Sequence, residues 1–298
     1  MAIMDSVRDA GQLEFRCREA TRAVVFVTVM FAVLLGALYA NVLPELVSDW
    51  WEDANYSHGF LVPLFSAYLV WQRREVIRAT ECRPSWWGLG VILIGIASLV
   101  LGHVGAEAFL NRSSLIVILA GLILFHAGGP VLRAVMFPLA FLLFMIPLPA
   151  IVFYAVAFPL QGLAAQNAAW TLDHLGVPVL IDGNVIHLSH ISLGVTEACS
   201  GIRSLISLLA LALGWAALVM PGGIAMAIFA AVTIPITILA NAARVVMTGL
   251  VGQWFGRQYA EGFFHMASGW IIFVFAFFCL LAVDRGLRFV LTRRTSRP

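Results

Sequence analysis

The sequence predicts an all-α membrane protein that crosses the bilayer several times, and three observations lead to this fold class. Of the 298 residues, 61% are hydrophobic and 11% are charged, whereas a soluble domain carries about 25% charged residues. Apolar stretches close to the roughly 20 residues of a transmembrane helix recur along nearly the whole chain. The basic residues gather beside these stretches. We therefore expect residues 1–298 to form a single polytopic helical domain.

Eight apolar segments are long enough, alone or with their flanks, to form transmembrane helices. They cover approximately residues 21–43, 58–71, 86–103, 113–126, 131–146, 199–220, 224–246 and 263–283. The second and fourth have short apolar cores, which we expect to extend into the flanking residues.

The distribution of Arg residues predicts the orientation, because cytoplasmic loops and tails are enriched in Lys and Arg. Arg residues occur in the N-terminal tail, after the second segment, at the start of the fifth and in the C-terminal tail, as Arg8, Arg16, Arg18, Arg22, Arg73, Arg74, Arg78, Arg83, Arg133, Arg285, Arg288, Arg293, Arg294 and Arg297. The first loop instead carries Glu45, Asp49, Glu52 and Asp53. We expect cytoplasmic tails at 1–21 and 284–298, with that loop outside.

Residues 150–196 do not fit a simple alternation of spans. Residues 150–176 are long enough to cross the membrane but contain the polar residues Gln161, Gln166, Asn167, Asp173 and His174. We interpret them as an amphipathic helix that lies at, or dips into, the outer interface. The next stretch has Asp182-Gly183 between two β-prone runs, which predicts a short external hairpin.

Cys199 is the one cysteine of four that we expect near the outer face, at the start of the sixth segment. Cys17 and Cys82 are predicted to be cytoplasmic, and Cys279 lies within the last segment. None has a CxxC partner or metal-ligand spacing, so we predict neither a zinc site nor a disulfide framework. A thiol in the first turn of a helix is at the positive end of the dipole, which favours a nucleophilic thiolate. A small buried structural cysteine is the alternative.

Arg244 and His265 are expected at the same face as Cys199. A charge within an apolar helix costs at least about 2.5 kcal/mol, so Arg244 needs a partner or a task. Asn241 lies three residues earlier on the same helix face. His265 opens the last segment, and its imidazole group suits proton transfer. The alternatives are an interfacial Arg that reaches lipid phosphates and a structural His.

Three further residues are candidates for a supporting role. Arg203 lies one turn from Cys199 and could bind a substrate carboxylate, stabilise the thiolate, or only pair with Glu197 or a lipid. Tyr56 and His58 mark the outer start of the second segment and could line the same cleft. An aromatic belt at the membrane interface is the alternative for these two.

Together these segments resemble the exosortase family of bacterial membrane cysteine transpeptidases. The matching pieces, in the family's order, are NYSHGFLVP at 55–63, GNVIHL at 183–188, EACSGIRSLISLLAL at 197–211, NAARVVMTGL at 241–250 and GFFHMASGW at 262–270. The resemblance implies that Cys199, Arg244 and His265 are catalytic.

It also implies membrane-anchored protein substrates with a C-terminal sorting signal of the PEP-CTERM kind, made of a short motif, a transmembrane helix and a basic tail. The expected location is a bacterial inner membrane with the active site at the periplasmic face, in connection with exopolysaccharide production.

Other function classes remain open at this point. In a non-enzymatic transporter or polysaccharide-assembly subunit, Arg203, Arg244 and His265 would line an anion or lipid-headgroup pathway, although the internal repeats expected of a transporter are not seen. A plain hydrolase would share the same thioester. A net charge of +2, with no basic stretch interleaved with aromatics, excludes a nucleic-acid surface. The substrate motif, the acceptor nucleophile and the oligomeric state are not predicted.

Overall fold

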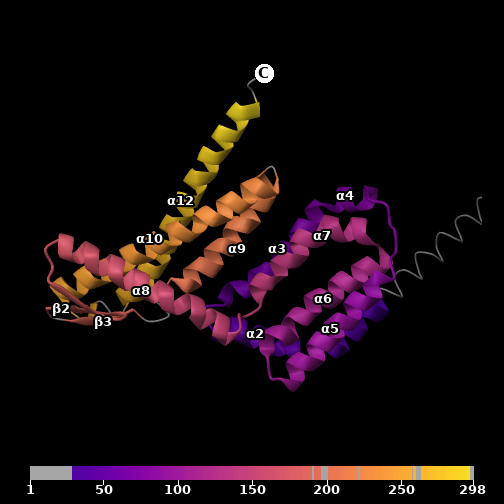
Figure 1. Ribbon diagram of the computed structural model, residues 1–298, viewed down its shortest axis with the longest axis horizontal. Coiled ribbons are helices and arrows are strands. Elements are labelled where there is room, and N and C mark those ends of the chain that lie inside the picture. Colours follow the sequence, from indigo (N-terminus) through magenta and orange to yellow (C-terminus); the bar gives the residue numbers. More distant parts are fainter. Residues whose placement is uncertain are drawn as a thin grey trace, which may run out of the picture. The chain divides into compact units, whose positions relative to one another are not determined.

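The computed structural model describes residues 29–295 except 190, 196–200, 221, 257 and 260–262; within this range, side chains are not described for 263–266 and 289–295. Figure 1 labels the elements in chain order. The chain forms two compact units, Met1–Ser48 and Asp49–Pro298. The second unit contains all the described residues of the candidate site.

Helices account for most of the described residues. They are α2 (Val42–Glu52), η1 (Ser57–Phe60), α3 (Leu61–Gln72), α4 (Arg74–Ala79), α5 (Trp87–Val104), α6 (Ala108–His126), α7 (Gly129–Phe141), η2 (Leu142–Met145), α8 (Ala150–His174), α9 (Ile202–Val219), α10 (Gly223–Phe255) and α12 (Phe263–Thr295). The strands are β1 (Val179–Asp182), β2 (Val185–Leu188) and β3 (Ser192–Gly194).

The described helices make this a multi-pass membrane protein. Five stretches are long and apolar enough to cross a bilayer, namely α5, α6, α9, α10 and Ala267–Arg288 within α12. Two bent pairs raise the number to seven at most: Val29–Leu38 with α2, bent by 67°, and Gly129–Met145 with α8, bent by 78°. The eight spans expected from the sequence are not confirmed. Residues 58–71, counted as one span, form a 3-10 turn and a helix of only 12 residues.

Helices α3 and α9 lie side by side and run in the same direction. The side chain of His58, just before α3, contacts Ser207 of α9. Seven residues further along each chain segment, a Cβ atom added at Gly214 would lie 2.9 Å from Cε1 of Phe65. Because the partners are equally spaced along both segments, the two helices begin at the same end of the unit.

Helix α7 runs antiparallel to α3. Ser66 donates a hydrogen bond of 2.7 Å to the carbonyl of Pro138, and Arg73 donates one of 3.0 Å to Ala134. The arginines around the end of α3 and the start of α7 therefore lie a helix length away from His58. The acidic residues Asp49, Glu52 and Asp53 precede His58 closely in the chain. The unit thus has an acidic end and a basic end.

The core of α9, α10 and α12 consists of apolar stripes. On α9, Leu208, Ala212, Ala216 and Met220 repeat every four residues, which places them on one helix face. They pack with the buried residues Ala225, Phe229, Ala240, Ile272, Ala276 and Leu280. The many alanines allow the three helices to approach closely, as is usual for packing within a membrane.

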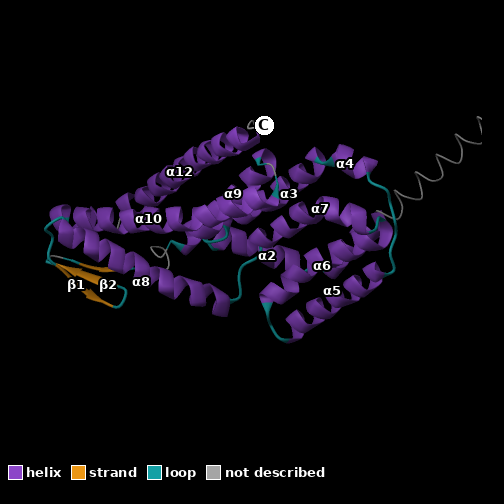
Figure 2. Ribbon diagram, turned by 45° about the horizontal axis from the view of Figure 1, so that its top comes forward, coloured by secondary structure: helices purple, strands orange, loops and turns teal. Residues whose placement is uncertain are grey.

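The predicted hairpin is present, and a third strand extends it. Strands β1, β2 and β3 form an antiparallel sheet in that order, with Asp182 opposite Val185. Gly183 has φ +58°, the left-handed conformation that an Asp-Gly turn uses and glycine adopts most easily. The buried residues Ile186 and Leu188 join the cluster that α8 forms with α10. Figure 2 shows the sheet beside α8.

Helix α8 differs from the amphipathic helix expected at 150–176. In its first half the exposed side chains are apolar, including Ile151, Val156 and Phe158. In its second half most exposed side chains are polar, namely Gln166, Asn167, Asp173 and His174, alongside the apolar Leu163 and Trp170. The exposed face of α8 is therefore mostly polar only beyond Gln161. Its first half suits an apolar environment, and its second half suits a polar one.

The contacts of α8 show which way it runs. Phe153 and Ala157, near its start, pack against Ile202 in the first turn of α9. Leu172, near its end, lies against Gly249 in the last part of α10. Helix α8 therefore leaves the start of α9 and follows the extension of α10, and it does not run alongside α9. Residues 144–148 and the start of α9 stay at the same end of the unit.

Candidate active site

The start of α9 lies directly against α10. Gly201, the N-cap residue of α9, has φ +81°. A Cβ atom at this position would lie 3.0 Å from both Cβ and Cγ of Asn241, whose side chain is 3% exposed. Both the left-handed backbone and the close approach require glycine. The segment 197–200, with Glu197 and Cys199, precedes this contact and lies outside the described residues.

Arg244 lies one turn after Asn241 on α10 and contacts α12. Its Nε donates a hydrogen bond of 3.4 Å to Oγ of the buried Ser268. A Cβ atom at Gly269 would lie 3.2 Å from Nη2 of Arg244, so the glycine leaves room for the guanidinium group. The charge of Arg244 is thus held between two helices, which lowers the cost of an arginine in an apolar helix.

His265 belongs to the first turn of α12, three residues before Ser268. Residues three apart are neighbours on a helix surface, so His265 and the Ser268 that contacts Arg244 share one side of α12. The side chain of His265 itself lies outside the described residues.

One hydrogen bond connects Arg203 of α9 with Asn55 in the turn before α3, and a second one stabilises that turn. Nε of Arg203 donates to Oδ1 of Asn55 at 2.9 Å. The backbone N–H of Asn55 donates to Oδ1 of Asp53 at 2.8 Å, which fixes the Asn55 turn. Asn55 was not singled out from the sequence, although it opens the motif NYSHGFLVP.

One turn further along both elements, His58 joins three segments. Nε2 of His58 lies 3.1 Å from the carbonyl of Phe144, and Nδ1 lies 3.3 Å from Oγ of Ser207. A carbonyl oxygen only accepts, so Nε2 carries the proton, and Nδ1 of the neutral ring accepts from the hydroxyl group. Ser207 was also missed, but its position four residues after Arg203 places both on one face of α9.

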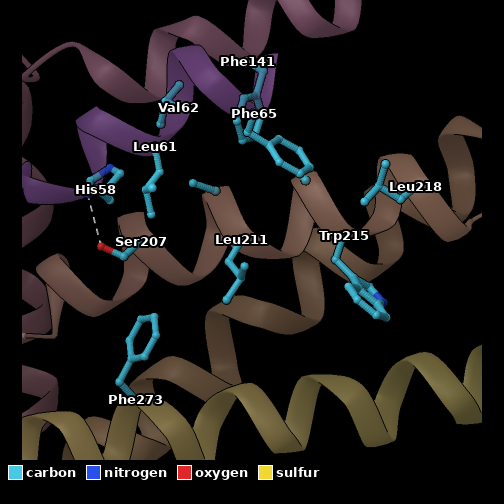
Figure 3. Close-up of a pocket in the computed structure, with 12 residues that line it drawn as sticks. His58, Leu61, Val62, Phe65, Phe141, Ser207, Leu211, Trp215, Leu218 and Phe273 are labelled. Atoms are coloured by element: carbon cyan, nitrogen blue, oxygen red, sulfur yellow. Dashed lines mark hydrogen bonds between the residues drawn. The ribbon is translucent and has the colours of Figure 1, made fainter. Parts of the chain in front are cut away.

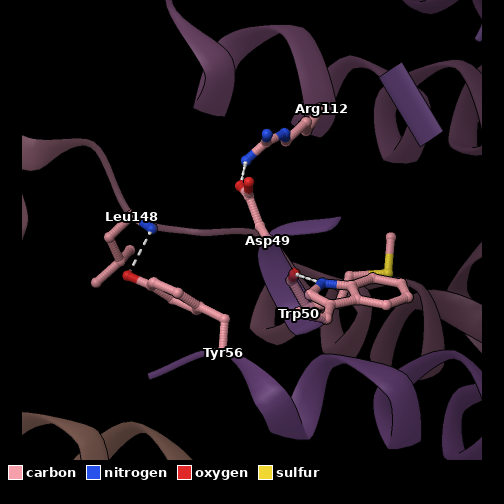
Figure 4. Close-up of polar contacts among 6 residues, drawn as sticks. Asp49, Trp50, Tyr56, Arg112 and Leu148 are labelled. Atoms are coloured by element: carbon pink, nitrogen blue, oxygen red, sulfur yellow. Dashed lines mark hydrogen bonds and ion pairs between the residues drawn. The ribbon is translucent and has the colours of Figure 1, made fainter. Parts of the chain in front are cut away.

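Tyr56, in the same turn, is buried and contacts the segment before α8. Its side chain is 5% exposed, and its hydroxyl oxygen accepts a hydrogen bond of 3.1 Å from the backbone N–H of Leu148. Burial raises the pKa of Tyr56 above its ordinary value. Figure 4 shows this contact.

Two further contacts hold the end of α2, just before Tyr56 (Figure 4). Nε1 of Trp50 donates to the carbonyl of Met145 at 2.7 Å, and Arg112, whose side chain is 7% exposed, pairs with Asp49 at 2.5 Å. Arg112 is a buried charge that sequence reasoning did not identify. Together with the Tyr56 hydrogen bond, these contacts attach the end of α2 and the turn after it to α6 and to residues 145–148.

An apolar groove runs between α3 and α9, with the His58–Ser207 pair at one of its ends. Its volume is about 340 Å³, and it is lined by His58, Leu61, Val62, Phe65, Phe141, Ser207, Ala210, Leu211, Gly214, Trp215, Leu218 and Phe273. We call it the α3–α9 groove. Figure 3 shows His58 and Ser207 at one end and Trp215 and Leu218 towards the other. In the part of the chain that the structure describes, no group of three or more His, Cys, Asp or Glu side chains could hold a metal ion.

Asn55, His58, Arg203, Asn241 and Arg244 thus lie around the start of α9. Comparison with protein-family models matches residues 50–282 to the transmembrane exosortase family. No curated protein and no solved structure matches the chain. The matched range covers the bulk of the chain, with every motif segment from residue 55 to residue 270 inside it. The chain therefore belongs to the transmembrane exosortase family.

Proposed function

We propose that this protein is a membrane-embedded cysteine peptidase and transpeptidase that cleaves C-terminal sorting signals of the PEP-CTERM kind from exported proteins. One observation carries the proposal. The start of α9 packs on Asn241, and Arg244, one turn further along α10, contacts Ser268 and Gly269 of α12. Cys199 stands two residues before the first contact, and His265 three residues before the second.

The proposed reaction has two steps. The Cys199 thiolate attacks the carbonyl carbon of the scissile peptide, the C–N bond breaks, and a thioester forms. His265 donates a proton to the leaving amine and then removes one from the incoming amine or water, which resolves the thioester. Arg244 stabilises the oxyanion that develops in both steps. No metal or organic cofactor enters this scheme.

Chain connectivity supports the role of Cys199. Two residues extend at most about 7 Å along the chain, so the thiol cannot be far from Gly201, which touches Asn241. Asn241 and Arg244 are three residues apart and share one helix face. An arginine held between two helices at this end is better placed for a developing oxyanion than one that extends to the lipid.

The acidic and basic ends of the unit support an outward-facing site in the bacterial inner membrane. Asp53 adjoins Asn55, which is bonded to Arg203 beside the site. Arg73, bonded to Ala134, lies at the other end. Because arginines favour the cytoplasmic side, the site would open at the periplasmic face, where exported substrates arrive.

The test is co-expression with a candidate substrate that carries a C-terminal transmembrane anchor, followed by mass spectrometry of the new C-terminus. A shortened substrate should appear with the active protein and with Cys82→Ala, which changes an exposed cysteine, but not with Cys199→Ala. A free carboxylate would indicate hydrolysis, and an added mass would indicate transfer to an amine. Equal processing by Cys199→Ala would overturn the proposal.

A further inference from the structure

The α3–α9 groove is open along one side, and one of its walls is α9, a helix long and apolar enough to cross a bilayer. Leu61 and Leu211, from opposite walls, are 67% and 40% exposed. Apart from the His58–Ser207 pair at one end, the lining side chains are aliphatic or aromatic. Water does not stably fill such a space, because it finds too few hydrogen-bond partners there. In a bilayer the groove faces hydrocarbon.

A positive charge lies at the polar end of this groove. Arg203 is one helical turn, or about 6 Å, from Ser207 towards the start of α9, and the Asn55–Arg203 and His58–Ser207 pairs follow each other along the same seam. Oδ1 of Asn55 accepts a hydrogen bond from Nε of Arg203. The two terminal nitrogen atoms of the guanidinium group therefore remain available to bind a ligand. Among the described residues, nothing else is bonded to Arg203. These two nitrogens form the fork that binds phosphate or carboxylate oxygens.

The length of the groove matches one leaflet. From Ser207 to Leu218 the lining follows α9 over a length of about 16 Å at the helical rise. Half of a typical hydrocarbon core is about 15 Å. A ligand with an anionic group at Arg203 would therefore place its apolar part along the groove, down to the middle of the bilayer.

The size and the lining of the groove distinguish among possible occupants. A transmembrane helix is at least about 10 Å wide, so only one face of such a helix could enter a groove of 340 Å³. An extended peptide would leave its backbone N–H and C=O groups without partners in an apolar lining, at a cost of several kcal/mol for each group. A single hydrocarbon chain is narrow enough for the groove and has no polar backbone groups that need partners.

We propose that the α3–α9 groove is a phospholipid-binding site, in which one acyl chain lies along α9 and the phosphate group pairs with the Arg203 fork. The positive charge at the mouth of the groove complements the phosphate, and the groove leads directly to the candidate active site. Lipid binding here does not depend on the proposed peptidase function.

The test measures lipid retention by the purified full-length protein, without substrate, by native mass spectrometry. The probes are phosphatidylglycerol, phosphatidylethanolamine and diacylglycerol with identical acyl chains. Both phospholipids should be retained, and diacylglycerol, which lacks the phosphate, should not. Equal retention of diacylglycerol, or retention of neither phospholipid, would overturn the site.

Two variants address the two halves of the site. Arg203→Gln should weaken phospholipid binding about tenfold or more, as expected for a lost charge-assisted hydrogen bond. Ala210→Phe should abolish it, because Ala210 is a buried lining residue. Matched controls are Arg78→Gln and Ala97→Phe, which change an exposed Arg and an exposed Ala elsewhere. If Ala210→Phe binds phospholipid as well as Ala97→Phe does, the groove is not the binding site. This conclusion holds even if Arg203→Gln fails to fold.

Photocrosslinking identifies the occupant directly. A phospholipid with a diazirine in its acyl chain, reconstituted in vesicles, should label Leu211 and Trp215 more than exposed residues of α5 such as Leu93. Equal labelling of α5 would mean ordinary lipid contact and would contradict the proposal. Labelling of the groove by a diazirine-bearing transmembrane peptide, with none by the lipid, would assign it to the substrate.

Discussion

Gly201 and Asn241 touch across the junction of α9 and α10, and a side chain at Gly201 would fit only if Asn241 moved. A Cβ atom there would lie 3.0 Å from the Asn241 side chain, and the φ of +81° is already unfavourable for other residues. This contact places the residues that follow Cys199 next to the helix that carries Arg244. The geometry of the candidate site therefore depends on a glycine that has no chemical role.

Gly201→Ala should reduce substrate processing by about 10²-fold, because a displacement of about 1 Å is enough for such a loss. The matched control is Gly176→Ala. Gly176 has the same φ of +81° but nothing within 4 Å of a Cβ atom. Both variants should lose about 1–3 kcal/mol of stability from backbone strain, measured by thermal unfolding in detergent. Equal processing by the two variants would show that the contact with Asn241 is unimportant.

Cys199→Ala should abolish processing while the protein is still folded and inserted, because the thiol forms the bond to the substrate. Cys199→Ser should be nearly as inactive, since a hydroxyl group is far harder to ionise at neutral pH. Immunoblots of the substrate measure the shift in size, and size-exclusion profiles monitor folding. Full activity of the alanine variant would favour a transporter or an assembly subunit over an enzyme.

Arg244→Lys should lower processing by about 10²-fold or more, the usual effect of losing an oxyanion donor. Lysine keeps the charge but lacks the planar fork that reaches Ser268 and Gly269. Initial rates with a fixed amount of substrate provide the measurement. Arg78→Lys, at an exposed position of α4, is the control. A rate for Arg244→Lys equal to that of the control would leave Arg244 with a positioning role only.

A membrane-impermeant thiol reagent should label Cys199 in intact cells with a permeabilised outer membrane. The protein used is a variant without Cys17, Cys82 and Cys279. The expectation rests on the parallel arrangement of α3 and α9 and on the acidic end that they share. Labelling only after lysis would place the site at the cytoplasmic face and reverse the proposed orientation.

The sequence by itself determined the class of the protein and its family. Low charge and long apolar segments identify a multi-pass helical membrane protein, because these properties depend on composition and local order alone. The Asp182-Gly183 turn was recognisable because the turn residues dictate the backbone. The motifs around Cys199, Arg244 and His265 identified the family, since each is a contiguous stretch of sequence.

The tertiary structure alone decided which helix faces meet. In a membrane, a face that packs on another helix and a face that contacts lipid are both apolar, so hydropathy cannot show that α3 lies parallel to α9. The pairing of Arg203 with Asn55 and the bond between Tyr56 and Leu148 follow from that packing.

The number of spans also depended on the tertiary structure. The bend of 78° between Gly129–Met145 and α8 depends on where α8 finds its partners, since Leu172 lies against Gly249 of α10. No property of residues 150–176 alone specifies that contact.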